Sequence, residues 1–262
     1  MREYFAQAKD VRLYVREDGE PGAPPLVLSN SLGTDISMWE PQLQAFTETH
    51  RVIRYDMRGH GRSEASTGAY DIELLARDAL AVFDAAGLTA TDYCGLSLGG
   101  MVGQWLAINE PGRLGRAVLA NAGIFIPPQA IAPRLEAIRD VGLAGLVEQI
   151  VPRWFTPAFI TSHPGVVEDL KRVFLANSED GYYGCSAALG TLDHRRLIGT
   201  VTVPVLVIGG DHDPATKPEH SRELAEKVLG AKLLMLDAAH LSNIEQPELF
   251  TAAVLDFLGR EE

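Results

Sequence analysis

Short apolar runs alternate with longer amphipathic stretches along most of the chain. Residues 11–17 alternate apolar and polar side chains, as a half-buried strand does. Buried strands are predicted for six apolar runs bounded by Gly, Pro, Asn or Asp: 24–30, 50–56, 91–97, 115–122, 203–210 and 231–237. Helices are predicted between them, over about 39–48, 71–87, 98–110, 218–229 and 245–258.

This alternation predicts the architecture of the sheet. Strands that alternate with helices form a mostly parallel sheet. Each helix carries the chain back along the sheet in a right-handed crossover, so that successive strands run in the same direction. The stretch 4–17 is expected to add antiparallel strands at one edge. The sequence therefore predicts an α/β fold with a mostly parallel central sheet and helices on both faces.

One segment, from about residue 127 to 197, breaks this pattern. It contains no convincing buried strand, and prolines separate helical pieces such as 130–150 and 165–177. We interpret 127–197 as a helical cap inserted into a core formed by residues 1–126 and 198–262. The cap carries seven basic and eight acidic residues, whereas the formal charge of the whole chain is −12, so the cap is its least acidic part.

Composition and charge exclude several classes of function. With 262 residues, 46% of them hydrophobic, the chain is long enough for a sizeable core. Its charge of −12 argues against nucleic acid or an anionic membrane surface as a partner. No apolar run is long enough to span a membrane and the first ten residues lack the apolar core of a signal peptide, so a cytoplasmic location is expected.

The two cysteines give no sign of a metal site, because they lie far apart in the sequence and match no ligand spacing. Cys94 falls within an apolar run, which favours a buried, unreactive thiol.

The stretch Gly95-Leu96-Ser97-Leu98-Gly99 fits the pattern G-x-S-x-G. It follows the predicted strand 91–97 and opens the predicted helix 98–110, which is the setting in which a serine serves as a nucleophile. Such a serine is strained and needs neighbours without side chains, and the start of the helix favours negative charge. A tight joint that needs its glycines only for packing is the alternative. No phosphate-binding glycine pattern is present.

A serine nucleophile needs a base and an acid that orients the base. His240 follows the predicted strand 231–237, at the sheet edge shared with Ser97, and His50 lies at the opposite edge. Exposed loops or helix starts are expected for four other histidines, His60, His163, His194 and His220, and His212 has aspartates on both sides. Asp213, just past the strand 203–210, is preferred over Asp211 as the acid.

Two amide donors are predicted for the oxyanion that forms when a carbonyl is attacked. One is the N–H of Leu98, directly after the serine, and the other is the N–H of Leu32, in the loop after the strand 24–30. The stretch "YDMRGHGRS" (55–63) carries Asp56 and Arg58, which we interpret as parts of a rigid turn after a strand rather than as acid–base groups.

The serine elbow, "DMRGHGRS", "GGDHDPATKPE" and "AAHLSNIEQPELF" resemble the α/β-hydrolase superfamily over nearly the whole chain. "SNSLGTDISMWEPQ" and "YCGLSLGGMVGQWLA" are similar to the 3-oxoadipate enol-lactonases of bacterial aromatic catabolism, in the β-ketoadipate pathway. Many members of the superfamily have His-Gly where this chain has Asn30-Ser31, and this difference fits the enol-lactonases.

The resemblance implies an α/β-hydrolase fold and a Ser-His-Asp carboxylic-ester hydrolase that opens a small anionic lactone without a metal or a cofactor. By position it assigns Ser97 as nucleophile, His240 as base, Asp213 as acid, and Leu32 and Leu98 as oxyanion donors. These are the positions that the residue patterns indicate independently.

An anionic substrate needs local cations in a chain of charge −12. The cap offers Arg134, Arg139 and Arg153, the last beside Trp154, and a clamp by Arg134 and Arg139 is the preferred hypothesis. Solvated helix residues are the alternative interpretation for these arginines. Two other functions stay open: a carboxylesterase or perhydrolase-like enzyme acting on another small ester, and a non-catalytic hydrolase-like binding protein.

Overall fold

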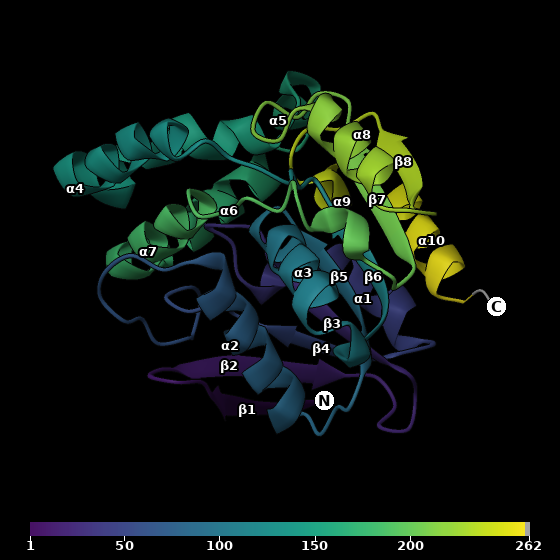
Figure 1. Cartoon of the computed structure of the whole chain (residues 1–262). Coiled ribbons are helices and arrows are strands. Elements are labelled where there is room, and N and C mark those ends of the chain that lie inside the picture. Colours follow the sequence, from purple (N-terminus) through teal and green to yellow (C-terminus); the bar gives the residue numbers. More distant parts are fainter. Residues whose placement is uncertain (260–262) are drawn as a thin grey trace.

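The computed structural model describes residues 1–259 and contains an eight-stranded sheet within them (Figure 1). The strands are β1 (Arg2–Gln7), β2 (Arg12–Asp18), β3 (Pro25–Ser29), β4 (Arg51–Tyr55), β5 (Thr91–Leu96), β6 (Leu114–Ala120), β7 (Val205–Gly210) and β8 (Lys232–Leu236). Their order is β1-β2-β4-β3-β5-β6-β7-β8. β2 pairs antiparallel with β1 and β4, and every other pair is parallel. The predicted α/β-hydrolase sheet is confirmed.

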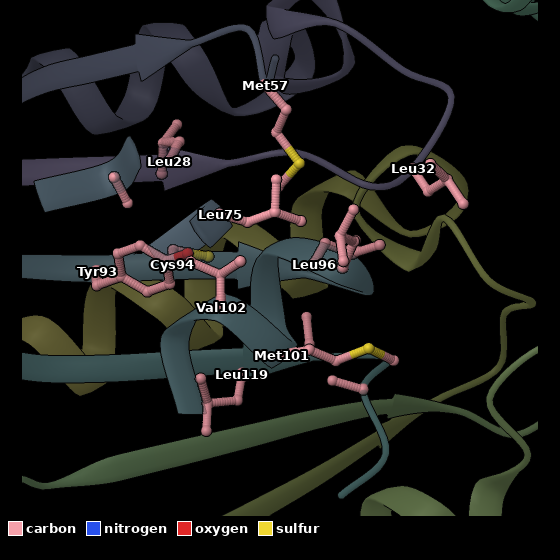
Figure 2. Packing of buried hydrophobic residues seen from close by; sticks show 14 of the residues in the cluster. Leu28, Leu32, Met57, Leu75, Tyr93, Cys94, Leu96, Met101, Val102 and Leu119 are labelled. Carbon is pink, nitrogen blue, oxygen red and sulfur yellow. The ribbon is translucent and has the colours of Figure 1, made fainter. Parts of the chain in front are cut away.

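The central strands are apolar on both sides because helices cover both faces of the sheet. α2 (Ile72–Ala85), α3 (Leu98–Asn109) and α8 (Pro218–Lys227) cover one face, and α1 (Glu40–Thr47) and α10 (Pro247–Leu258) cover the other (Figure 1). Figure 2 shows the packing at β5 and α3, where Tyr93, Cys94 and Leu96 meet Met101 and Val102. Cys94 is fully buried, as predicted, and burial raises the pKa of its thiol.

Short helical turns lie between the longer elements. Single 3₁₀ turns lie at Ile36–Trp39, Pro111–Arg113, Val151–Trp154 and Ile198–Thr200. The predicted helix 245–258 corresponds to α10, and a separate short helix, α9 (Ser242–Glu245), precedes it and ends before Gln246. Pro247 causes the break, because it has no N–H to continue α9 but fits the first position of a new helix.

Four helices occupy the stretch that breaks the strand–helix pattern: α4 (Pro128–Ile150), α5 (Pro157–Ser162), α6 (Pro164–Ala176) and α7 (Glu179–Leu189). α4, α6 and α7 pack together beyond one end of the sheet (Figure 1). Gly142 breaks α4 with a φ of 61°, a conformation that glycine adopts without strain. We propose that these helices form the cap, as the division at 127 and 197 predicts.

No helix within residues 1–259 combines the length and the apolar character needed to cross a membrane.

The turn after β4 is built around two buried charged side chains. The carboxylate of Asp56 accepts the backbone N–H groups of Ile36 at 2.8 Å and Arg62 at 2.9 Å. The guanidinium of Arg58 donates twice to Asp78, at 2.6 and 2.7 Å, and is fully buried. These contacts support the interpretation of Asp56 and Arg58 as parts of a turn.

Two histidines expected in exposed loops are buried instead. His60 is fully buried, and His194 is buried with its Nδ1 3.2 Å from the amide oxygen of Gln104. Burial lowers the pKa of each imidazole to about 4. The expectation failed because a loop's polarity along the sequence does not reveal that another segment covers it.

Asp56 predicts a measurable pH dependence of stability. Burial raises the pKa of its carboxyl from its ordinary value of 3.8 to about 6. The folded chain therefore holds this proton when the unfolded chain has lost it, so the free energy of unfolding falls as pH rises from about 4 to about 6. Asp56→Asn should remove this component, about 3 kcal/mol across the interval. Urea unfolding of both proteins at several pH values checks this, and parallel pH profiles would contradict it.

Candidate active site

Ser97 occupies a tight turn between β5 and α3. Its backbone has φ 55° and ψ −115°, a strained conformation for a residue with a side chain. A Cβ atom on Gly95 would lie 2.2 Å from the carbonyl oxygen of Gly99, and one on Gly99 would lie 2.2 Å from that of Ser29. The glycines of the G-x-S-x-G pattern are thus needed for room, and the turn they permit exposes Ser97 to a cavity.

The start of α3 lies directly behind this serine. Leu98 is the first residue of the helix, and the first N–H groups of a helix have no acceptor within it. Ser97 itself donates its N–H to Ala120 O at 2.8 Å, which ties the turn to the end of β6. The Leu98 amide and the helix dipole therefore favour negative charge beside Ser97.

Asp213 and His240 form a buried hydrogen-bonded pair at the same edge of the sheet. Asp213 follows β7 and His240 follows β8, and Nδ1 of His240 lies 2.8 Å from Oδ2 of Asp213. The two residues are 2% and 4% exposed. Because a carboxylate only accepts, Nδ1 carries the proton, and Nε2 is left as an acceptor on a side chain that lines the cavity with Ser97.

The environment of Asp213 keeps its carboxyl ionised. Burial alone would raise its pKa, but His240 and hydrogen bonds from Thr216 and Asn121 more than offset this, and the pKa lies at about 2. Oδ1 accepts the backbone N–H groups of Ala215 and Thr216 at 2.8 and 3.0 Å. Oδ2 accepts from Thr216 Oγ1 at 2.7 Å and from Asn121 Nδ2 at 3.0 Å.

Neighbouring acidic and basic groups stay apart from this pair. Asp211 is exposed and forms an ion pair with Arg222 at 3.1 Å. His212 is also exposed and pairs with Asp237 at 2.7 Å. Of the two aspartates weighed from the sequence, the structure brings Asp213 to His240.

The loop after β3 presents the Leu32 amide at the cavity. Asn30 braces this loop, since its Nδ2 donates to Tyr55 O at 3.0 Å and its Oδ1 accepts from Trp39 at 2.9 Å. The residues on either side of Leu32 both donate their N–H groups within the protein. Ser31 donates to the sulfur of Met38, and Gly33 donates to Nε2 of His60. Within residues 1–259 no protein group accepts the N–H of Leu32, and its side chain lines the cavity.

The cavity has a volume of about 650 Å³, within the range of small-molecule sites. It brings together Ser97, His240, Leu32, Trp154 and Arg134 of the predicted residues. Its other walls come from apolar side chains and a few charged ones: Met101, Phe125, Ile126, Ile131, Ile150, Leu189, Arg153, Arg195, His220 and Glu223.

Arg139, predicted to act with Arg134, does not line this cavity. Its guanidinium lies over the ring of Tyr183, 4.6 Å from the centroid, and donates to the Tyr183 hydroxyl. The physical reason is the period of the helix, since residues five positions apart lie about 140° apart around its axis. The predicted clamp of two arginines is therefore not formed.

The remaining cations of the cavity differ in how they are neutralised. Arg195 donates twice to Asp193, at 2.8 and 2.7 Å, and stacks on Phe125. Arg153 makes one long hydrogen bond, 3.4 Å, to the carbonyl of Pro214. Arg134 has no ion pair or hydrogen bond within residues 1–259. It is therefore the cation best able to bind a carboxylate.

No group of three or more His, Cys, Asp or Glu side chains within the described part of the chain is arranged to hold a metal ion.

Asn121 is a central residue of the site that the sequence did not indicate. It is fully buried just after β6, with a φ of 46°. Its Nδ2 donates to Asp213 Oδ2 and, at 3.2 Å, to Ala239 O, while its Oδ1 accepts from Ser242 Oγ at 2.6 Å. Its carbonyl accepts from Thr216 Oγ1 at 2.7 Å. Only its place after an apolar run, on the shared edge, could have drawn attention to it.

Asn121 thus links the Asp213 loop with the chain on both sides of His240. We expect Asn121→Gly, which keeps the backbone conformation but removes the amide, to lower kcat about tenfold and leave KM within about twofold. The reason is that Asn121 holds Asp213 in place without lining the cavity. Steady-state kinetics with melting temperatures checks this.

Gln42→Ala is the matched control, because Gln42 is an equally buried amide that donates to Asn243 O at 2.8 Å and does not touch Asp213. Equal losses of kcat in the two variants would mean that Asn121 serves stability alone.

Several known proteins match this chain along most of its length. The model of the alpha/beta hydrolase family matches residues 6–253. 3-oxoadipate enol-lactonase 2 of Acinetobacter baylyi is 40% identical over 248 residues, covering 94% of this chain and 93% of that protein. The crystal structure of the enol-lactonase from Burkholderia xenovorans LB400 is 41% identical, with a TM-score of 0.96 over 98% of this chain and 100% of that one.

A relative of another kind also matches along most of its length. RutD of Variovorax paradoxus, whose name gives carbamate hydrolysis only provisionally, is 34% identical over 267 residues, covering 95% of this chain and 96% of that protein. The chain belongs to the alpha/beta hydrolase family.

Proposed function

We propose that the chain hydrolyses a small carboxylated enol-lactone, 3-oxoadipate enol-lactone, to 3-oxoadipate, as a step of aromatic catabolism through the β-ketoadipate pathway. It is a carboxylic-ester hydrolase by its family and by its enol-lactonase relatives. The observation that carries the proposal is the 2.8 Å hydrogen bond between Asp213 and His240, at a cavity that both His240 and the strained Ser97 line. Ser97 is the nucleophile, His240 the base and Asp213 the acid of the proposed triad.

The proposed reaction begins with attack on the lactone carbonyl. Nε2 of His240 takes the proton of the Ser97 hydroxyl as its oxygen bonds to the carbonyl carbon. Asp213 stabilises the imidazolium that forms, because its carboxyl is already ionised. The N–H groups of Leu32 and Leu98 receive the oxyanion.

Collapse of this intermediate opens the ring. The bond between the carbonyl carbon and the ring oxygen breaks, and His240 returns its proton to the leaving oxygen. That oxygen leaves as an enol, which is a better leaving group than an alkoxide, and its change to the ketone draws the reaction forward. Water activated by His240 then cleaves the ester bond to Ser97 and releases the second carboxylate of the product.

The cavity supports a substrate that carries a free carboxylate. Arg134 offers an unpaired guanidinium there, and its planar fork can hold a carboxylate through two hydrogen bonds. The apolar walls, Trp154 among them, suit the ring of a lactone. A neutral ester would leave the guanidinium without its partner, so the cation favours the anionic lactone over other small esters.

An assay of the purified chain tests the reaction itself. We expect the absorbance of the enol-lactone to disappear with enzyme, and Ser97→Ala to lower kcat by about 10⁴-fold or more. The acyl group on Ser97 should be trapped by acid quenching and identified by mass spectrometry. Faster turnover of a neutral ester or a carbamate than of the lactone would assign the same site to a different substrate.

The carboxylate contact has its own test. Arg134→Ala should raise KM for the anionic lactone by about tenfold or more, the loss expected for one charge-assisted hydrogen-bonded pair, and leave KM for its methyl ester nearly unchanged. Arg139→Ala is the matched control, because Arg139 lies on the same helix but contacts Tyr183 outside the cavity. An unchanged KM for the anionic lactone in Arg134→Ala would contradict the assignment.

A further inference from the structure

Gly33, the residue after Leu32, is held at both of its backbone polar groups. Its N–H donates to Nε2 of His60 at 3.0 Å, and its carbonyl accepts from Nδ2 of Asn177 at 3.0 Å. His60 is fully buried and Asn177 is 7% exposed. Gly33 has a φ of +86°, and a Cβ there would lie 2.9 Å from the ring of Phe174. The loop therefore has little freedom at this point.

The hydrogen bonds of His60 define its tautomer. Because the N–H of Gly33 can only donate, Nε2 accepts and carries no proton. Nδ1 then holds the proton and donates to the carbonyl of Arg58 at 3.1 Å. Burial lowers the pKa of the imidazole to about 4, so the ring is neutral near pH 7 and able to accept. His60 is thus a fixed link between the turn after β4 and the loop after β3.

Asn177 makes the corresponding link from the cap. It lies between α6 and α7, and its Oδ1 accepts the N–H of Gly61 at 3.2 Å. The next residue, Ser178, donates its N–H to Gly59 O at 2.9 Å. A Cβ on Gly181 would lie 2.3 Å from the Cα of Gly59, so no side chain fits between the two segments. The junction of α6 and α7 is therefore docked directly on the turn that carries His60.

We propose that His60 and Asn177 are positioning residues for hydrolysis, which fix the loop so that the Leu32 N–H meets the developing oxyanion. The inference rests on the proposed function, in which Leu32 is an oxyanion donor. His60 holds the peptide between Leu32 and Gly33, and Asn177 holds the peptide after it. The cap thus stabilises the transition state through the loop, in addition to lining the cavity.

This arrangement separates the effect on the transition state from the effect on substrate binding. Neither His60 nor Asn177 lines the cavity, so their loss removes no contact with the substrate. A loop that fluctuates would place the Leu32 N–H wrongly in the transition state, where the oxyanion needs it most. The expected signature is a lower kcat with an unchanged KM.

The test compares Asn177→Ala and His60→Leu with two reference variants. Both are expected to lower kcat for the lactone about tenfold or more and to leave KM within about twofold. His60→Gln should recover most of the rate, because its amide oxygen can accept the N–H of Gly33. Ser162→Ala is the cap control, since Ser162 is exposed, bonds within α5 and to the adjacent His163, and does not line the cavity.

The rate at which a fluorophosphonate labels Ser97 is the second readout, because its phosphoryl oxygen would occupy the same pair of amides. Labelling should slow in Asn177→Ala and His60→Leu at an unchanged melting temperature. If Asn177→Ala fails to fold, Asn177→Ser, which keeps a small polar side chain, replaces it in the same measurements. If His60→Leu fails to fold, the Asn177 variants decide the proposal. An unchanged kcat, or a higher KM with an unchanged kcat, would overturn the proposal.

The labelling experiment also separates this proposal from the proposed function. If the wild-type chain does not open the enol-lactone but is labelled at Ser97, the substrate assignment has failed and the labelling rates of the variants still decide the role of His60 and Asn177. If the wild-type chain opens the lactone and all variants match it in both readouts, the role of these two residues has failed alone.

Discussion

The close approach of β3, β5 and the start of α3 is the constraint on which the site depends. Gly95 and Gly99 leave no space for a side chain, because the carbonyl oxygens of Gly99 and Ser29 fill the positions that Cβ atoms would take. Ser97 is forced into a strained conformation there, at a cost of about 1–3 kcal/mol. β3 and β5 can hold that strain, since each is buried along nearly its whole length and is paired with two neighbouring strands. The same packing brings the loops after β3, β5, β6, β7 and β8 to one edge of the sheet.

The same edge of the sheet also holds a buried carboxylate, that of Asp213. Asp213 would be protonated in an apolar interior, yet its oxygens face two backbone amides, Thr216, Asn121 and His240, and these donors keep its pKa at about 2. The donors come from three loops, so the ionised carboxylate also orders those loops around itself. Asn121 accepts a left-handed backbone conformation to reach it. Charge and geometry are thus established before a substrate enters, which is the condition for electrostatic stabilisation without reorganisation.

The sequence allowed the fold and the order of Ser97, Asp213 and His240 to be predicted, because parallel strands must end at one edge and buried strands are visible as apolar runs. It did not indicate Asn121, which stood inside a predicted strand, since a single residue beyond β6 reads as part of the run. Nor did it indicate the burial of His60, because its neighbours include Tyr182 of α7, more than one hundred positions away, whose ring lies 6.4 Å from that of His60. Nor did the sequence show that Arg134 lines the cavity and Arg139 does not. Their difference arises from the side of α4 on which each lies.

Charge explains how an acidic chain could bind the anionic substrate proposed for it. At physiological ionic strength, charges beyond about 8 Å of water are largely screened, so the formal charge of −12 acts weakly at a distance. Within the cavity a substrate carboxylate 4 Å from Arg134 would be poorly screened, with a Coulomb attraction on the order of 4 kcal/mol for an effective dielectric constant of about 20. Hydrolysis of the proposed lactone would create a second carboxylate, and the other two arginines that line the cavity differ in charge balance: Arg153 makes only a 3.4 Å hydrogen bond to the carbonyl of Pro214. Arg195 is already neutralised by Asp193, and Glu223 lies on the same wall. The negative charge of Glu223 would therefore repel the proposed dianionic product more strongly than the monoanionic substrate, and this difference favours release over rebinding.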